Sequence, residues 1–137
     1  VEIRVCDMPA NLEQVLSLTA FVQCLVKCIS DEIDEGAYQL QHHPMMVQQN
    51  KWRATRYGID ASLVNNDSYQ LYSVMDTTRQ LVDLVGPMSQ RLECTDELNR
   101  IYDLVHHSGA KRQLEIMEAT GDKREVVKQM TEENNNF

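Results

Sequence analysis

The segment from Leu12 to Ile29 constrains the fold most, because as a helix it is apolar around most of its circumference. Apolar side chains recur every three or four residues along one face, and a second apolar stripe lies beside the first. Four polar residues interrupt the segment: Glu13, Gln14, Gln23 and Lys27. A membrane-spanning helix needs about 20 consecutive apolar residues and rarely tolerates such interruptions. We therefore predict a helix over residues 12–30 that packs on two sides, and no membrane as a partner.

The opening residues 1–8 alternate as a strand does. Val1, Ile3 and Val5 fall on one face, and Glu2, Arg4 and Cys6 fall on the other. Pro9 ends the run. No second strand of comparable length follows, and an unpaired strand edge is unfavourable. We therefore expect further sheet strands upstream of Val1.

Helical periodicity and capping residues predict five more helices. Pro44, Ser73 and Thr95 mark helix starts, and Gly58 and Gly121 mark helix ends. Residues 61–64 and 69–72, on either side of a turn at 65–67, predict a short β-hairpin. The predicted helices cover about 43–57, 74–92, 95–106, 110–120 and 122–133. The predicted fold class is α+β: a mostly helical fragment with one N-terminal strand and a short β-hairpin, forming a single region over 1–137.

Composition excludes some classes of partner. The net charge of −8 disfavours a nucleic-acid backbone or an anionic membrane surface, both of which require clustered Lys and Arg. The four cysteines form no CxxC pair, which is typical of reduced thiols in a cytoplasmic protein. Cys24 and Cys28 lie in the apolar segment and are predicted to be small core residues. The acidic residues 31–35 are predicted to end the first helix as an exposed loop.

Glu2 and Arg4 form the first candidate site. Because they are two residues apart on the predicted strand, their side chains share a face. A carboxylate is a hard ligand for Mg²⁺, and a guanidinium binds phosphate or carboxylate through paired donors. The alternative is an ordinary charge pair on a solvated strand face.

Residues 50–60 form the second candidate. Asn50, Arg53 and Tyr57 lie on one face of the predicted helix, and Arg56 is three residues from Arg53. A positive helix face in so acidic a chain is suited to an anionic ligand. The alternative is a solvated surface with Trp52 as a core anchor. Farther along, Lys111 and Arg112 at a predicted helix start oppose the helix dipole, which hints at a ligand or an acidic partner.

Three blocks of the sequence together resemble one family. They are the strand 1–7 followed by a proline, the Asn-Lys-Trp-Arg-Ala run through Tyr-Gly-Ile-Asp at 50–60, and Gly-Ala-Lys-Arg-Gln at 109–113. In this order they resemble the carboxyl-terminal part of type 2 glutamate–cysteine ligases, a carboxylate–amine ligase family. The resemblance implies a glutamine-synthetase-like fold whose curved sheet carries metal-binding carboxylates.

The resemblance also implies a function. It implies an ATP- and Mg²⁺-dependent ligase that phosphorylates glutamate to an acyl phosphate, which the amine of cysteine then attacks. Carried over, Glu2 is the metal ligand and Arg4 the catalytic contact to phosphate or substrate. Asn50, Arg53 and Arg56 are substrate- or phosphate-binding residues. The expected partners are glutamate, an amine acceptor, an N-terminal part of the same protein and a second copy in a homodimer. The fragment alone is expected to be inactive. The alternative function is a non-catalytic helical interaction or dimerisation module.

Overall fold

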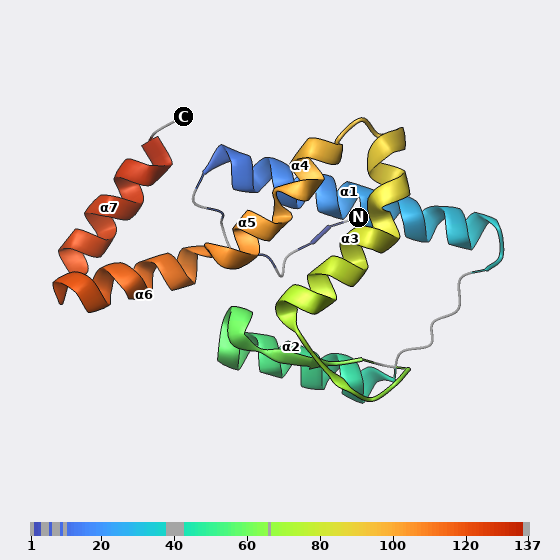
Figure 1. Cartoon of the computed structure of the whole chain (residues 1–137), viewed down its shortest axis with the longest axis horizontal. Helices are drawn as coiled ribbons and strands as arrows, with labels where there is room; N and C mark the ends of the chain where they lie inside the picture. Colours follow the sequence, from blue (N-terminus) through green and yellow to red (C-terminus); the bar gives the residue numbers. More distant parts are fainter. Residues whose placement is uncertain are drawn as a thin grey trace.

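The computed structural model describes residues 2–3, 6, 9, 11–37, 43–65 and 67–135 of the 137-residue chain. These residues are mostly helical and include one two-stranded antiparallel sheet, which confirms the predicted α+β character. Figure 1 shows α1 lying across α3, α4 and α5, with α2 at the far end of α3 and α6 and α7 extending to the left. In chain order the elements are α1 (Leu12–Asp34), α2 (Pro44–Tyr57), η1 (Gly58–Asp60), β1 (Ser62–Val64), β2 (Leu71–Ser73), α3 (Val74–Arg91), α4 (Thr95–Asn99), α5 (Ile101–His106), α6 (Gly109–Thr120) and α7 (Lys123–Asn135).

Helix α1 begins where the sequence predicts and ends later. The Asn11 side chain caps the first turn by accepting a 2.9 Å hydrogen bond from the Gln14 amide. The prediction that residues 31–35 form a loop is wrong, because the helix continues to Asp34. Asp31 is paired with Lys27 one turn earlier and with Arg91 of α3, whose Nη1 lies 3.0 Å from Oδ2. These ion pairs offset the charge of Asp31 at the start of the last turn of the helix.

The core forms where α1 meets α3, α4 and α5. Six buried residues make up its centre: Ala20, Cys24, Val82, Val85, Leu98 and Ile101. On α1 the buried positions Ser17, Ala20 and Cys24 are all small and recur at spacings of three and four. Small residues on one face allow the neighbouring helices to approach α1 closely. This face of α1 is therefore the packed one, whereas Leu12, Val15 and Leu16 on other faces remain exposed.

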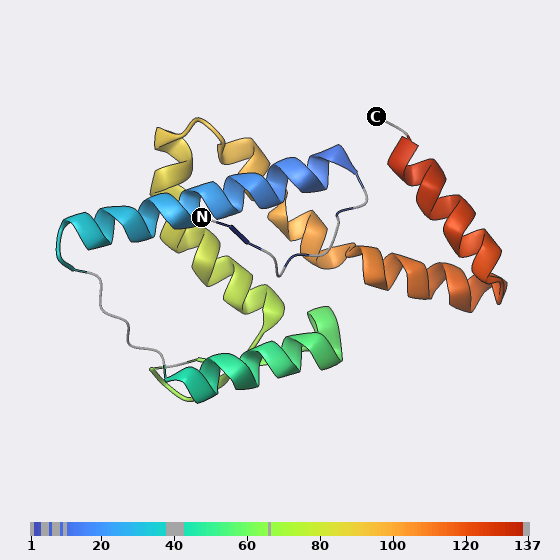
Figure 2. The ribbon, with the colours of Figure 1, turned by 180° about the vertical axis from the view of Figure 1, so that it is seen from behind.

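Helix α1 is also long and apolar enough to cross a membrane by length and composition alone, a test that core helices of soluble proteins also pass. In this structure α3, α4 and α5 pack against it, as Figure 2 shows from behind. The opposite side of α1 carries no such cover among the described residues. The sequence predicts that α1 packs on two sides, and within the described chain it packs on one.

A tight turn joins α3 to α4. The Cys94 amide donates to the Ser89 carbonyl at 2.9 Å, and the Glu93 amide donates to the Gln90 carbonyl at 3.4 Å. This pair of hydrogen bonds is the Schellman arrangement, in which the residue after the cap adopts left-handed backbone geometry. Glu93 occupies that position with φ of 54° although it is not glycine.

The predicted helix 95–106 is two helices, α4 and α5, which meet at Arg100. Thr95 is the first helical residue, and its predecessor Cys94 is the cap. No glycine or proline explains the interruption. Leu98 and Ile101 on either side of it are both buried in the core, so the two short helices pack on α1 as one surface.

The hairpin is confirmed, with β1 at Ser62–Val64 within the predicted run 61–64 and β2 at Leu71–Ser73 overlapping the predicted run 69–72. Leu63 pairs with Tyr72 in the antiparallel register, and Ser73 at the end of β2 caps α3 by accepting from the Asp76 amide at 3.0 Å. The predicted strand over residues 1–8 is not found in its described part. Glu2, Ile3 and Cys6 belong to no strand, and the rest of that segment lies outside the described residues. A strand requires a hydrogen-bonded neighbour, and within the described chain β1 and β2 pair only with each other.

Helices α6 and α7 pack against each other and extend from the rest of the molecule, as Figures 1 and 2 both show. Both helices were predicted from the sequence. Gly121 ends α6 in left-handed geometry with φ of 67°. Arg112 of α6 donates from Nε to Glu133 of α7 at 2.8 Å, which supplies the acidic partner expected for this basic helix start.

Candidate functional site

The predicted Glu2–Arg4 site is described only in part. Glu2 is exposed and belongs to no strand, and Arg4 lies outside the described residues. No group of three or more His, Cys, Asp or Glu side chains within the described part of the chain is placed to hold a metal ion. The roles of Glu2 as a metal ligand and of Arg4 as the catalytic residue stay predictions.

The three predicted ligand-binding residues, Asn50, Arg53 and Arg56, lie on helix α2, which packs against strand β1 of the hairpin. His43 caps the start of α2 through Nδ1, which accepts from the Met45 amide at 3.2 Å, and Pro44 occupies the first turn. One face of α2 contacts strand β1, and none of its residues is buried. The helix therefore lies on the surface and is held along one edge.

Asn50 makes the firmest of these contacts. Its Nδ2 donates to the Val64 carbonyl at 2.8 Å, and its Oδ1 accepts from the Val64 amide at 2.7 Å. The side-chain amide therefore pairs with the strand as a neighbouring backbone would. Both polar atoms of the Asn50 side chain are engaged in holding α2 against β1.

Arg53 continues the same edge one turn later. Its Nη1 donates to the Ser62 carbonyl at 3.3 Å. Its Nε is buried and has no hydrogen-bond partner among the described residues. A buried N–H without a partner is costly, so this atom marks a place where an acceptor is expected.

Arg56 differs from its two neighbours. Its side chain is exposed and makes no ion pair with any described residue. Trp52 is 54% exposed and packs edge-on against Tyr57, with ring centroids 5.9 Å apart. The alternative in which Trp52 is a core anchor is therefore wrong, because Trp52 contributes to the outer surface of α2.

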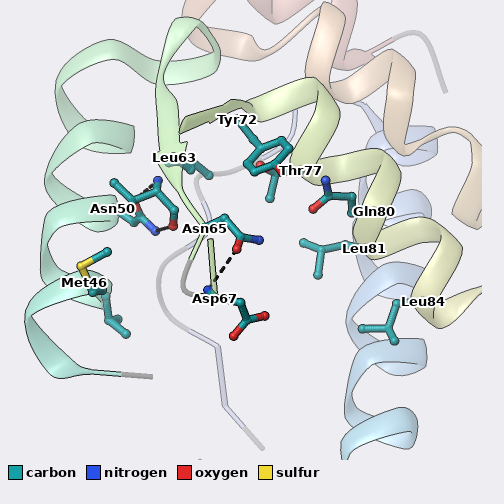
Figure 3. A pocket seen from close by; sticks show the side chains of 12 residues that line it. Met46, Asn50, Leu63, Asn65, Asp67, Tyr72, Thr77, Gln80, Leu81 and Leu84 are labelled. Atoms are coloured by element: carbon teal, nitrogen blue, oxygen red, sulfur yellow. Dashed lines mark hydrogen bonds between the residues drawn. The ribbon is translucent and has the colours of Figure 1, made fainter. Parts of the chain in front are cut away.

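A hollow of about 570 Å³ lies between α2, the hairpin and α3. Figure 3 shows Met46, Leu63, Leu81 and Leu84 around it, so most of the wall is apolar. Asp67 carries the only charge on this wall among the described residues. An anion is not suited to such a hollow, because no Lys or Arg of the described chain lines it.

Of the predicted residues that the structure describes, only Asn50 lines this hollow, and Arg53 and Arg56 do not. The α3 part of the wall, which includes Thr77 and Gln80, was not predicted as a site. On the sequence these positions look like the polar side of an amphipathic helix. Only the fold of α3 against the hairpin brings them opposite Met46.

Comparison with known proteins supplies the family. The sequence profile described as Glutamate-cysteine ligase family 2 matches residues 1–133. The chain is 38% identical over 135 residues to a protein of Clavibacter sepedonicus and 32% identical over 135 residues to one of Leifsonia xyli subsp. xyli, each named "Putative glutamate--cysteine ligase 2". Each alignment covers 97% of this chain but only 35% and 36%, respectively, of the relative.

The chain therefore spans about a third of the length of these relatives. No solved structure matches it, so the glutamine-synthetase-like fold stays a prediction. The family match runs nearly the whole length of the chain and includes all three blocks that carry the resemblance. The chain belongs to the glutamate–cysteine ligase family 2.

Proposed function

We propose that this chain is part of a cytoplasmic, ATP-dependent carboxylate–amine ligase that joins glutamate to the amine of cysteine, forming a γ-glutamyl amide through an acyl phosphate. The observation that carries the proposal is the family match over residues 1–133. The names of the relatives support cysteine as the acceptor. Because the chain spans about a third of those relatives, the activity is proposed for a whole protein of their length.

The described residues do not fit ATP and Mg²⁺ by themselves. In phosphoryl-transfer sites Mg²⁺ is bound by carboxylates together with phosphate oxygens and water. Of the two predicted residues Glu2 and Arg4, only Glu2 is described, and the described chain gathers no further carboxylates around a metal position. We propose that the other ligands of ATP and Mg²⁺ come from the remainder of the protein.

The guanidinium groups of α2 support an anionic ligand at this helix. Arg56 is exposed without an ion pair among the described residues, and Arg53 holds a buried Nε that has no acceptor there. A carboxylate or phosphate binds guanidinium through paired hydrogen bonds. We propose that Arg56 and Arg53 contact the glutamate carboxylate or a phosphate, and that Asn50 contributes by fixing α2 on the hairpin.

The test is a ligase assay on the full-length protein with glutamate, ATP, Mg²⁺ and a panel of amines, read by phosphate release. Cysteine is expected to give the highest turnover. Arg4→Ala and Arg56→Ala should each lower kcat/KM about 100-fold or more, because both remove a charge that stabilises the transition state. Lys51→Ala, which removes another exposed cation of α2, is the matched control and should retain turnover.

Unchanged melting temperatures in these variants would separate a loss of chemistry from a loss of fold. Wild-type turnover in Arg4→Ala, or no phosphate release with any amine, would overturn the proposal. The 137-residue chain alone should bind no MgATP in calorimetry, since its described residues assemble no metal site.

A second candidate function is a helical interaction or dimerisation module. The exposed apolar surface of α2 favours it: Met45 is 68% exposed and Trp52 54% exposed. Light scattering of the purified chain, read together with the ligase assay on the full-length protein, distinguishes the two candidates. A stable dimer that forms without any ligase activity in the full-length protein would favour the module.

A further inference from the structure

Two cysteines far apart in the sequence meet in the core. The Sγ atoms of Cys24 and Cys94 are 3.6 Å apart, although 70 residues separate them along the chain. Cys24 lies in the middle of α1 and is fully buried. Cys94 is half-buried in the turn that joins α3 to α4. Both are free thiols.

This arrangement is close to what a disulfide requires. A disulfide brings the two sulfurs to about 2.05 Å, so the pair must close by about 1.5 Å. Cys94 is the cap residue of α4, and its side chain makes no capping hydrogen bond. Rotation of its side chain therefore does not cost α4 a cap. The neighbouring residue Glu93 already adopts left-handed backbone geometry. The turn, and not the Cys94 thiol, therefore determines the local backbone conformation.

The two thiols differ in their accessibility to solvent and oxidants. Burial, together with the hydrogen bond and the charge of Cys94, raises the pKa of the Cys24 thiol to about 11. Cys24 is therefore a protonated thiol at neutral pH and is shielded from solvent. Cys94 is the accessible member of the pair, and thiolates in contact with solvent react first with oxidants.

We propose that Cys24 and Cys94 form an intramolecular disulfide when the protein meets hydrogen peroxide. The Cys94 thiolate attacks the peroxide, the O–O bond breaks, and Cys94 becomes a sulfenic acid while hydroxide leaves. The Cys24 sulfur then attacks the Cys94 sulfur, the S–O bond breaks, and the thiol proton leaves with the oxygen as water. Two thiols are thus oxidised to one disulfide, and one peroxide is reduced to two waters.

The bond would tie the middle of α1 to the α3–α4 turn. Closing a loop of this length restricts the unfolded chain, which in the chain-entropy view shifts the folding equilibrium by on the order of 1,000-fold. The disulfide would therefore stabilise the core under oxidising conditions, and a thiol reductant would return the protein to its reduced, less stable form.

Cys28 is a second cysteine on α1, and it competes with Cys24 for the bond to Cys94. It lies one turn after Cys24 on α1 and is half-buried. Its pKa is raised by burial and by the charges of Glu32 and Asp31. Cys28 packs against the same core cluster, but the sulfur contact is between Cys24 and Cys94. The proposal therefore requires the bond at Cys24 and not at Cys28.

The experiment uses the whole chain with the exposed Cys6 changed to serine, because tryptic cleavage leaves Cys6 and Cys24 on one peptide, 5–27. Trypsin cuts after Lys27, so Cys28 falls on a different peptide from Cys24, and Cys94 lies on peptide 92–100. The protein is treated with hydrogen peroxide, blocked with a maleimide and digested without reduction. Mass spectrometry should find peptides 5–27 and 92–100 joined, with the loss of two hydrogen atoms.

Three variants sharpen the outcome. Cys28→Ser should leave the crosslink intact. Cys94→Ser should abolish it and leave Cys24 unmodified. Cys24→Ala should abolish it and leave Cys94 as a sulfenic acid that dimedone traps; circular dichroism checks that this core variant still folds. A dominant crosslink to Cys28, or no joined peptide while Cys94 is oxidised further, would overturn the proposal.

Discussion

The side-chain amide of Asn50 forms two hydrogen bonds with the backbone of Val64, one in each direction, at 2.8 and 2.7 Å. Fourteen residues separate the two positions, and the contact joins α2 to the edge of β1. The helix has no buried residue, so this pair and the Arg53–Ser62 contact carry much of its attachment. Removing either group leaves backbone polar atoms of β1 without a partner.

Asn50→Ala should therefore loosen α2 from the hairpin. The loss of two hydrogen bonds to a partly buried strand edge predicts a fall of about 1–3 kcal/mol in the free energy of unfolding. Urea denaturation followed by circular dichroism measures it. Gln49→Ala, an exposed neighbour on the same helix, is the control and should change stability little. Equal effects of the two substitutions would contradict the anchoring role of Asn50.

Glu93→Gly should stabilise the protein. Glu93 has φ of 54°, where an L side chain is strained and glycine is not. Relief of that strain, set against the greater freedom of glycine in the unfolded chain, predicts a gain of about 0.5–1 kcal/mol. Gln90→Gly, within the last turn of α3, should instead lose about 1 kcal/mol. Opposite signs in a denaturation experiment are the expected result, and a loss in both would show that no strain resides at Glu93.

Leu98→Ala tests the core. Leu98 is 1% exposed and lies in the cluster that joins α1, α3 and α4. A buried Leu→Ala change is expected to cost about 2–5 kcal/mol, because it removes apolar burial and leaves a cavity. Leu114→Ala makes the same chemical change at a position that is 63% exposed, and it should alter the melting temperature little. A small shift in both variants would mean that Leu98 does not stabilise the packing.

Asp31→Asn tests the pH dependence of the link between α1 and α3. The hydrogen bond from Lys27, with the contribution of Arg91, lowers the pKa of the Asp31 carboxyl below its ordinary value of 3.8. A carboxyl whose pKa is lower in the folded state than in the unfolded state stabilises the fold at pH values above its unfolded pKa. That stabilisation is lost as the pH falls through the folded pKa. The stability difference between wild type and Asp31→Asn should therefore narrow in acid.

Denaturation at about pH 6 and about pH 3 measures that change. Asp34→Asn, in the same acidic run, is the control and should show no comparable narrowing. An NMR titration in which the Asp31 carboxyl titrates above its ordinary value would contradict the ion pairs with Lys27 and Arg91.

Local signals in the sequence predicted most of the helices. Asn11 and Ser73 cap α1 and α3 as expected, because a capping side chain acts within three residues and needs no tertiary contact. The end of α1 was predicted wrongly; one of the two ion pairs of Asp31 is with Arg91, which lies 60 residues away. The sequence shows the charges of such a pair but not that they meet.

In the candidate site, too, the elements were predicted from the sequence but the contacts between them were not. The helix that carries Asn50, Arg53 and Arg56 was predicted, as was the hairpin that follows it. The contact between them was not, because the pairing of Asn50 with Val64 depends on how two correctly predicted elements pack. The hollow beside Leu81 and Leu84 was missed for the same reason. Glu2 and Arg4 stay predictions that rest on the family.

The face of α1 formed by Ser17, Ala20 and Cys24 has a consequence for how this sequence can evolve. All three side chains are buried against neighbouring helices, and the Ser17 hydroxyl has no partner among the described residues. Polarity is thus of little value at these positions, whereas volume is strictly limited. Exchange among serine, alanine and cysteine should be accepted at Ser17 and Ala20, whereas Cys24 also carries the thiol that meets Cys94. Residues as large as leucine should be selected against at all three positions, because they would separate the helices. In a collection of related sequences, this face of α1 should vary in chemistry while remaining uniformly small.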